Sequence, residues 1–235
     1  MGEVTMSANN QSAQGGDNHI NLYEPHVWKH HTKVAGLEWK NPVGTASGTF
    51  QYAAVRWFYD VSQLGAVCTK GASPVPWEGN PSPRTAESPA ANINAVGLQN
   101  PGIDHYLAED LPKLKAAGAF VISNVAGHCD DDYAAVVEKL ADSDADMLEI
   151  NVSCPNVSAG GMSVGTDPVA LANLMDRLRP MTDKPMIVKL TPNVTDITVP
   201  ARAAVEHGAD ALSMINTLKG MRINIHTGKP IIANV

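Results

Sequence analysis

Two stretches of the chain have the hydrophobic spacing of helices with one buried face. Between residues 131 and 142, and again between residues 167 and 179, apolar residues recur at intervals of three and four. Asp167 followed by Pro168 predicts a helix start, because the aspartate side chain can accept hydrogen bonds from free amides and proline has no amide to leave unbonded. Helix ends that need a left-handed residue are predicted at three glycines: Gly65, Gly118 and Gly208.

Six short segments between the predicted helices are apolar on both faces, as parallel strands covered by helices are. The predicted strands are residues 43–47, 66–70, 119–124, 147–153, 186–191 and 211–217. An open doubly wound sheet and a (β/α)8 TIM barrel both fit this alternation. Because no Gly-x-Gly-x-x-Gly turn follows an early strand, the barrel is favoured, with about six of its eight strands in this chain. Residues 33–39 predict a hairpin that turns at Gly36.

Polar residues stand at the ends of the predicted strands. They are Lys70, Asn124, Asn151, Lys189 and Asn216, with Ser47 near the end of the first strand. In a barrel these ends meet on one face, where active sites are built. Singly, each asparagine is as well explained by capping a loop, and each lysine by a surface charge whose stem lies on apolar surface. Together they predict a site for a planar, carbonyl-rich or anionic ligand.

One strand runs directly into a loop of small residues that contains a cysteine. Residues 148–161 read Leu-Glu-Ile-Asn-Val-Ser-Cys-Pro-Asn-Val-Ser-Ala-Gly-Gly, so Cys154 follows the strand's carboxyl end beside Asn151 and Asn156. A thiol there suits proton transfer under a loop that opens and closes over a substrate. The alternative is a small buried residue at a turn, and we expect that structural role for Cys68 and Cys129.

Composition limits the classes of protein to consider. With 235 residues, 44% of them hydrophobic, the chain can bury the core of one large α/β domain. The net charge of −7 argues against nucleic-acid binding. Neither an apolar run long enough to span a membrane nor a signal segment is found, and three cysteines without a Cys-x-x-Cys pair indicate a reducing compartment. We therefore expect a cytoplasmic protein without membrane contact. The eight histidines have no metal-ligand spacing, so no metal site is predicted.

Two parts of the chain differ from this alternating pattern. Residues 1–31 are mostly polar and contain too few apolar residues to pack, which predicts a disordered N-terminal extension and leaves residues 32–235 as the folded domain. The segment 73–101, rich in proline, glycine and asparagine, is too long for an ordinary loop.

Several long motifs resemble those of the class 1 dihydroorotate dehydrogenases, over roughly residues 32–235. The motifs are Asn-Pro-Val-Gly-Thr-Ala-Ser-Gly-Thr-Phe at 41–50, Gly-Asn-Pro-Ser-Pro-Arg at 79–84, Asn-Ala-Val-Gly-Leu-Gln-Asn-Pro-Gly at 94–102, Asn-Val-Ala-Gly at 124–127, Asn-Val-Ser-Cys-Pro-Asn-Val at 151–157 and Met-Ile-Asn-Thr at 214–217. The Cys154 loop and the Gly-Leu-Gln-Asn sequence are most similar to the catalytic subunit of subclass 1B.

The resemblance implies a reaction, a cofactor and site residues. Cys154 would remove a proton from C5 of dihydroorotate while a hydride passes from C6 to FMN, giving orotate for pyrimidine synthesis. Orotate would be held by Lys70, Asn94, Asn151, Asn156, Asn216 and Thr217, with backbone groups of Val96, Gly97 and Leu98. FMN would contact Ala46, Ser47, Gly48, Lys70, Asn124, Asn151 and Lys189. The segment 73–101 would then carry substrate contacts.

The same resemblance implies partners and an early end to the chain. We expect a homodimer core and an electron-transfer subunit, with FAD and an iron-sulfur cluster, that passes electrons to NAD. Members of the family continue through two more strands whose glycine-rich turns bind the FMN phosphate, so the domain is expected to be incomplete at its C-terminus. Two alternatives stay open: an inactive truncated barrel without flavin, and a barrel lyase that forms a Schiff base through Lys189 or Lys70.

Overall fold

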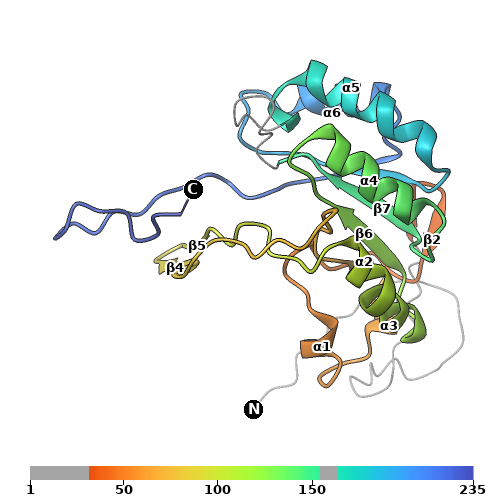
Figure 1. Cartoon of the computed structure of the whole chain (residues 1–235), viewed down its shortest axis with the longest axis horizontal. Coiled ribbons are helices and arrows are strands. Elements are labelled where there is room, and N and C mark those ends of the chain that lie inside the picture. Colours follow the sequence, from red (N-terminus) through yellow and green to blue (C-terminus); the bar gives the residue numbers. More distant parts are fainter. Residues whose placement is uncertain (1–31, 154–163, 235) are drawn as a thin grey trace, which may run out of the picture.

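A curved parallel sheet of five strands forms the centre of the computed structural model, which describes residues 32–153 and 164–234 (Figure 1). The strand order is β3-β6-β7-β8-β9, so each strand lies beside its sequence neighbour in the sheet, as in part of a barrel wall. The strands are β3 (Val67–Cys68), β6 (Val121–Val125), β7 (Met147–Asn151), β8 (Met186–Lys189) and β9 (Ala211–Ser213).

Helices cover one face of this sheet, where α4, α5 and α6 lie side by side (Figure 1). Their apolar faces and alternate strand residues such as Val121, Leu148 and Val188 form the main core. The α-helices are α1 (Tyr52–Val55), α2 (Ile103–His105), α3 (Leu111–Ala116), α4 (Asp130–Ala141), α5 (Pro168–Leu178) and α6 (Thr198–Glu206), and a π-helical turn (Tyr106–Asp110) joins α2 to α3. Short 3-10 turns span Val61–Gln63, Val164–Thr166 and Arg179–Met181.

The predicted helices and five of the six predicted strands are confirmed to within a few residues, but the first strand is not. Residues 43–47 make a single parallel bridge, Gly44 to Ala66. Backbone bonds join the Gly65 amide to the Val43 carbonyl and the Thr45 amide to the Ala66 carbonyl. Beyond them the hydroxyl of Thr45 accepts from the amide of Cys68 at 2.9 Å and donates to its carbonyl at 3.3 Å, so a side chain takes the place of the next backbone pair. The sheet therefore has five strands, and this segment lies against the β3 edge.

The predicted caps are mostly confirmed. Asp167 accepts hydrogen bonds from the amides of Val169 and Ala170 at the start of α5. Gly118 and Gly208 have φ angles of +75° and +95°. The prediction for Gly65 is wrong, because its φ is not among the positive values. A Cβ on Gly65 would lie 2.0 Å from the carbonyl oxygen of Asn41, so close backbone approach excludes a side chain there.

The concave face of the sheet is apolar near the amino ends of the strands. Cys68, Ile122, Met147 and Ile187 form a second, smaller core there. The predicted hairpin, β1 (Thr32–Val34) and β2 (Leu37–Trp39), packs against this layer, and the Trp39 ring contacts Phe120 with 5.8 Å between ring centroids. The hairpin thus covers the lower end of the concave face and leaves the carboxyl ends of the strands as the place for a site.

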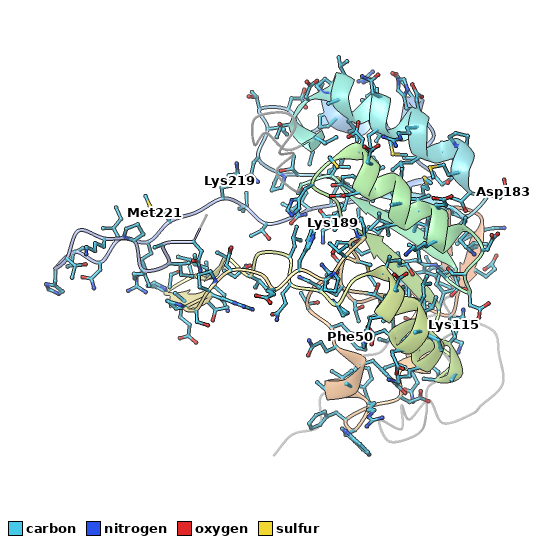
Figure 2. The ribbon with its side chains drawn as sticks, viewed as in Figure 1. Phe50, Lys115, Asp183, Lys189, Lys219 and Met221 are labelled. Carbon is cyan, nitrogen blue, oxygen red and sulfur yellow. The ribbon has the colours of Figure 1, made fainter. Side chains whose placement is uncertain are left out.

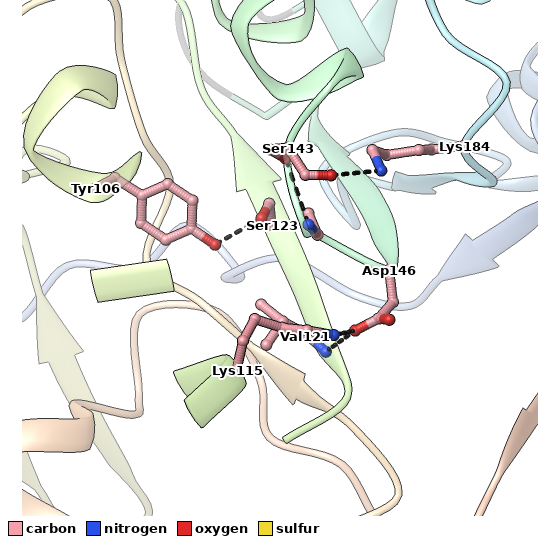
Figure 3. Close-up of polar contacts among 8 residues, drawn as sticks. Tyr106, Lys115, Val121, Ser123, Ser143, Asp146 and Lys184 are labelled. Atoms are coloured by element: carbon pink, nitrogen blue, oxygen red, sulfur yellow. Dashed lines mark hydrogen bonds and ion pairs between the residues drawn. The ribbon is translucent and has the colours of Figure 1, made fainter. Parts of the chain in front are cut away.

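Hydrogen bonds and an ion pair join the amino ends of the strands to a helix and to neighbouring loops (Figure 3). The carboxylate of Asp146 accepts from the Val121 amide at 2.7 Å and from the Lys115 ammonium at 2.6 Å. Lys184 donates to the carbonyl of Ser143 at 2.8 Å. These contacts join α3, β6 and the loops that precede β7 and β8, and they lie at the end of the sheet opposite the predicted site.

Two extended segments project away from the sheet (Figure 1). One is the hairpin of β4 (Thr85–Ser88) and β5 (Ala91–Asn94), and the other is the arm of residues 218–234. Hydrogen bonds from Arg222 to the carbonyl of Glu87 and from Asn234 to the carbonyl of Pro81 join the arm to the hairpin region. Among the residues described, no helix combines the length and apolar character needed to cross a membrane.

Candidate functional site

The carboxyl ends of the strands carry polar side chains on the concave face. Asn124 of β6 is paired in register with Glu149 of β7, and Asn151 of β7 with Lys189 of β8. All four residues are buried, between 1% and 8% exposed. Because alternate residues of a strand share a face, Glu149 and Asn151 point the same way. The strands thus place two amides, one carboxylate and one ammonium group at the same edge.

Lys189 bonds to the segment of residues 43–47, across the concave face of the sheet. Its ammonium group donates to the hydroxyl of Ser47 at 3.1 Å, although 142 residues separate the two. Figure 2 shows Lys189 on the side of the sheet from which the arm with Lys219 and Met221 extends. Gly48 follows with a φ of +76°, and a Cβ built on it would lie 3.5 Å from the Lys70 ammonium. The predicted residues Ser47, Gly48, Lys70 and Lys189 therefore come together.

Glu149 bonds to Asn124 and to Cys68 from the strands on its other side. Its Oε1 accepts from Asn124 Nδ2 at 2.6 Å and from the Cys68 thiol at 3.3 Å. Burial raises the pKa of Cys68 well above its usual value, and the charge of Glu149 and the hydrogen bond to it raise it further. The ammonium group of Lys189 and the backbone amide of Ser47 act in the opposite direction on this pKa but are the smaller effects.

Asn151 links the site to the residues that follow β9. Asn216 Nδ2 donates to Asn151 Oδ1 at 2.8 Å, and the Tyr133 hydroxyl donates to the Asn151 carbonyl at 2.6 Å. The Thr217 amide bonds to Asn216 Oδ1 at 2.7 Å, and the Thr217 carbonyl accepts from Asn193. The two predicted asparagines and Thr217 therefore form one hydrogen-bonded group at the edge where β7 and β8 end.

Other predicted residues lie apart from this group or outside the described chain. Asn94 is the last residue of β5, on the projecting hairpin, and Val96 accepts from the amide of Asn80 beside Gly97 and Leu98. Leu98 accepts from the side chain of Asn100, so the bonds of Val96 and Leu98 stay within this part of the chain. Ala46 accepts from Thr49 within its own turn. Cys154 and Asn156 fall in residues 154–163, which the structure does not describe.

Sequence reasoning missed Glu149. The signal was present, because in Met-Leu-Glu-Ile-Asn the glutamate stands two positions before Asn151 and so on the same face of the strand.

The prediction that Cys68 is buried is confirmed at 3% exposure, and Cys129 is partly buried at the start of α4. Within residues 32–153 and 164–234, no cluster of three or more histidine, cysteine or acidic residues could hold a metal ion.

The buried hydroxyl of Tyr106 and the buried thiol of Cys68 should make the protein less stable in alkali. Burial raises the pKa of Tyr106 from 10.0 to about 12, and that of Cys68 from 9.0. Because the unfolded chain releases these protons at lower pH than the folded one, the contribution of these two groups to the free energy of unfolding is fully present below about pH 9 and is lost as pH rises above it. Tyr106→Phe should remove the part of the decline between pH 10 and 12, roughly 2 kcal/mol.

Urea denaturation at several pH values measures this slope. Tyr106→Phe will also lower stability at neutral pH, because the hydroxyl lies 2.5 Å from Ser123 Oγ, so the comparison is between slopes. Tyr59→Phe, at a tyrosine that is 45% exposed, is the matched control and should keep the full decline. Parallel curves for the wild type and Tyr106→Phe between pH 10 and 12 would contradict the prediction.

Comparison with known proteins gives consistent matches. A family model described as dihydroorotate dehydrogenase matches residues 29–235. A protein of Alkaliphilus metalliredigens named dihydroorotate dehydrogenase B (NAD(+)), catalytic subunit, is 53% identical over 206 residues, which are 86% of this chain and 67% of that protein. A protein of the same name from Alkaliphilus oremlandii is 50% identical over the same shares. A protein of Aquifex aeolicus named putative dihydroorotate dehydrogenase A (fumarate) is 48% identical over 86% of this chain and 66% of its own length.

Proposed function

Since the chain belongs to the dihydroorotate dehydrogenase family, we propose that it oxidises dihydroorotate to orotate in pyrimidine biosynthesis, as an FMN-dependent oxidoreductase. The observation that carries the proposal is the group of buried polar residues at the carboxyl ends of β6, β7 and β8, with Lys189 bonded to Ser47 across the concave face. A polar group of this kind, enclosed by apolar layers, suits a planar ligand with several carbonyl and imide groups.

The residues of this site fit a flavin. Gly48 is exposed beside the Lys70 ammonium group and leaves its backbone accessible, and a Cβ on the buried Gly71 would lie 2.6 Å from Asn124 Oδ1, so a residue without a side chain is needed there. Lys189 offers an ammonium group that would stabilise negative charge on a reduced ring. FMN would be held by Ala46, Ser47, Gly48, Lys70, Asn124, Asn151 and Lys189. When bound, FMN supplies the hydride acceptor.

The substrate would be bound and deprotonated by a set of residues that shares Lys70 and Asn151 with the FMN contacts. Asn151, Asn216 and Thr217 form the hydrogen-bonded group to which the orotate carboxylate and ring amides would bind. Lys70, Asn156 and the segment with Asn94, Val96, Gly97 and Leu98 would complete the contacts. Cys154 would take the C5 proton as the C6 hydrogen leaves with its electron pair, so that a C5–C6 double bond forms in orotate.

The fold and the partners complete the proposal. The five parallel strands would belong to a (β/α)8 barrel, with residues 32–235 as its FMN-binding part. The extension predicted for residues 1–31 lies outside the described residues. Relatives named B (NAD(+)) catalytic subunit support a partner subunit and NAD as the electron acceptor. We propose that this partner is an electron-transfer subunit with FAD and an iron-sulfur cluster. We also propose a homodimer core in the cytoplasm.

The visible absorption spectrum of the purified chain, recorded without oxygen before and after dihydroorotate is added, tests the proposal. We expect a flavin band that bleaches, because the hydride reduces the ring. The control is dihydroorotate added to free FMN, which should keep its colour. A chain that binds FMN but does not bleach with dihydroorotate would contradict the proposed substrate. A chain that binds no added FMN would contradict the cofactor.

A further inference from the structure

A buried carboxylate lies in a strand that is otherwise apolar or amide-bearing on this face. Glu149 is 5% exposed at the middle of β7, with Met147 before it and Asn151 after it on the concave side. Burying a carboxylate is costly unless hydrogen bonds and a nearby positive charge compensate. Apolar packing therefore does not explain a glutamate at this position.

The contacts of Glu149 decide how the Asn124 amide is oriented. An ionised carboxylate only accepts, so the 2.6 Å contact requires Asn124 to present its NH2 group to Glu149. The carbonyl oxygen of Asn124 is then turned to the other side, where it lies beside Gly71. Without the carboxylate, nothing among the described side-chain contacts of Asn124 would distinguish its two amide orientations.

Glu149 also contributes charge next to Lys189. The two side chains lie on the same face of neighbouring strands. The charge of Glu149 raises the pKa of Cys68, and that of Lys189 lowers it. The part of the chain that the structure describes holds no direct ion pair between them within 4.0 Å. Lys189 instead donates to Ser47, and Glu149 accepts from Asn124 and Cys68. The negative charge is thus held one layer below the ammonium group rather than neutralised by it.

We propose that Glu149 is a positioning residue for the cofactor side of the site. Its carboxylate fixes the Asn124 amide so that only the amide's carbonyl oxygen faces the ligand. It also places a negative charge beneath Lys189. The inference rests on the proposed function, since it concerns FMN. Both parts have measurable consequences. The fixed amide favours binding of FMN in both redox states, and the buried charge disfavours the anionic reduced flavin alone.

Glu149→Gln in the full chain tests both parts. Glutamine keeps the size but can donate or accept, so Asn124 loses its fixed orientation and the charge is removed. We expect the dissociation constant for oxidised FMN, measured by fluorescence quenching, to rise about tenfold, as for the loss of one hydrogen bond to a charged group. The dissociation constant for reduced FMN should change less. A tenfold difference between the two corresponds to a positive shift of about 30 mV in the two-electron reduction potential.

The control is Asp146→Asn, which removes a carboxylate in the loop just before β7, at the end of the sheet opposite the site. It should lower stability through the contacts with Val121 and Lys115 and leave FMN affinity and potential unchanged. Should Glu149→Gln fail to fold, Glu149→Asp keeps the charge and shortens the reach to Asn124. That variant should bind oxidised FMN more weakly and keep the wild-type potential within a few millivolts.

The outcomes separate this inference from the proposed function. Wild-type FMN affinity and potential in Glu149→Gln, or changes no larger than those of Asp146→Asn, would overturn the positioning role and leave the proposed function intact. Glu149→Asp with unaltered FMN affinity would overturn it as well. If the wild-type chain itself bound no FMN, the proposed function would fail first and the inference with it.

Discussion

Cys154→Ser should lower dihydroorotate turnover at neutral pH by roughly 10²–10⁴-fold, the usual contribution of a positioned general base. A cysteine thiol ionises near pH 8.5, whereas a serine hydroxyl stays protonated at any physiological pH, so serine without an activating base cannot take the C5 proton. The measurement is anaerobic flavin bleaching followed by stopped flow from pH 6 to 10, which reports the half-reaction without the partner subunit.

Neither of the other two cysteines offers the same chemistry. Cys68 is 3% exposed, and burial with the adjacent Glu149 raises its pKa, so it stays a thiol and lies below the site. Cys129 is partly buried at the start of α4 and provides the matched control. Cys129→Ser should bleach at the wild-type rate. Full turnover of Cys154→Ser at pH 7, with normal FMN content, would contradict the assignment of Cys154 as the base.

Gly65→Ala should destabilise the fold by about 3 kcal/mol or more, at the upper end of the cost of overpacking. The new Cβ would lie 2.0 Å from the Asn41 carbonyl oxygen and 3.0 Å from that of Val43. Both contacts are with backbone, which cannot rotate away as a side chain can. The amide of Gly65 also donates to the Val43 carbonyl at 2.8 Å, so the methyl group would push apart segments that this bond holds together.

The damage should extend to the site. The segment that would be displaced leads through the Gly44 bridge to Ser47, which accepts from Lys189. FMN affinity should therefore fall together with the free energy of unfolding, measured by urea denaturation. Gly220→Ala is the matched control, because a Cβ there meets nothing within 4 Å, and its stability should stay within about 0.5 kcal/mol of wild type. A Gly65→Ala variant as stable as this control would contradict the packing argument.

Much of the secondary structure could be predicted because it depends on neighbours in the sequence. The apolar repeat of α4 and α5 and the Asp167 cap act over three or four residues, and the structure has these helices within one residue of the predicted starts. The parallel strands β6, β7 and β8 were identified for a similar reason, since strands buried on both faces are continuous apolar runs.

The errors concern contacts between distant segments. Residues 43–47 read as a strand, but Thr45 bonds to Cys68 with its side chain, and only one bridge forms. Gly65 reads as a left-handed helix end, but its lack of a side chain is required by Asn41, 24 residues earlier in the sequence. Local propensity contains no information about which backbone will approach a glycine, so neither result could be reached from the pattern alone.

The sequence by itself determined the family, through motifs that residues 29–235 share with its members, and the set of polar residues at the strand ends. Only the tertiary structure decided which of these residues meet: Lys189 with Ser47, Asn216 with Asn151, and Glu149 with Asn124 and Cys68. The physical reason is that strand alternation gives the direction of each side chain within its own strand. The distance between side chains on different strands depends on register and curvature, and only the folded sheet sets these.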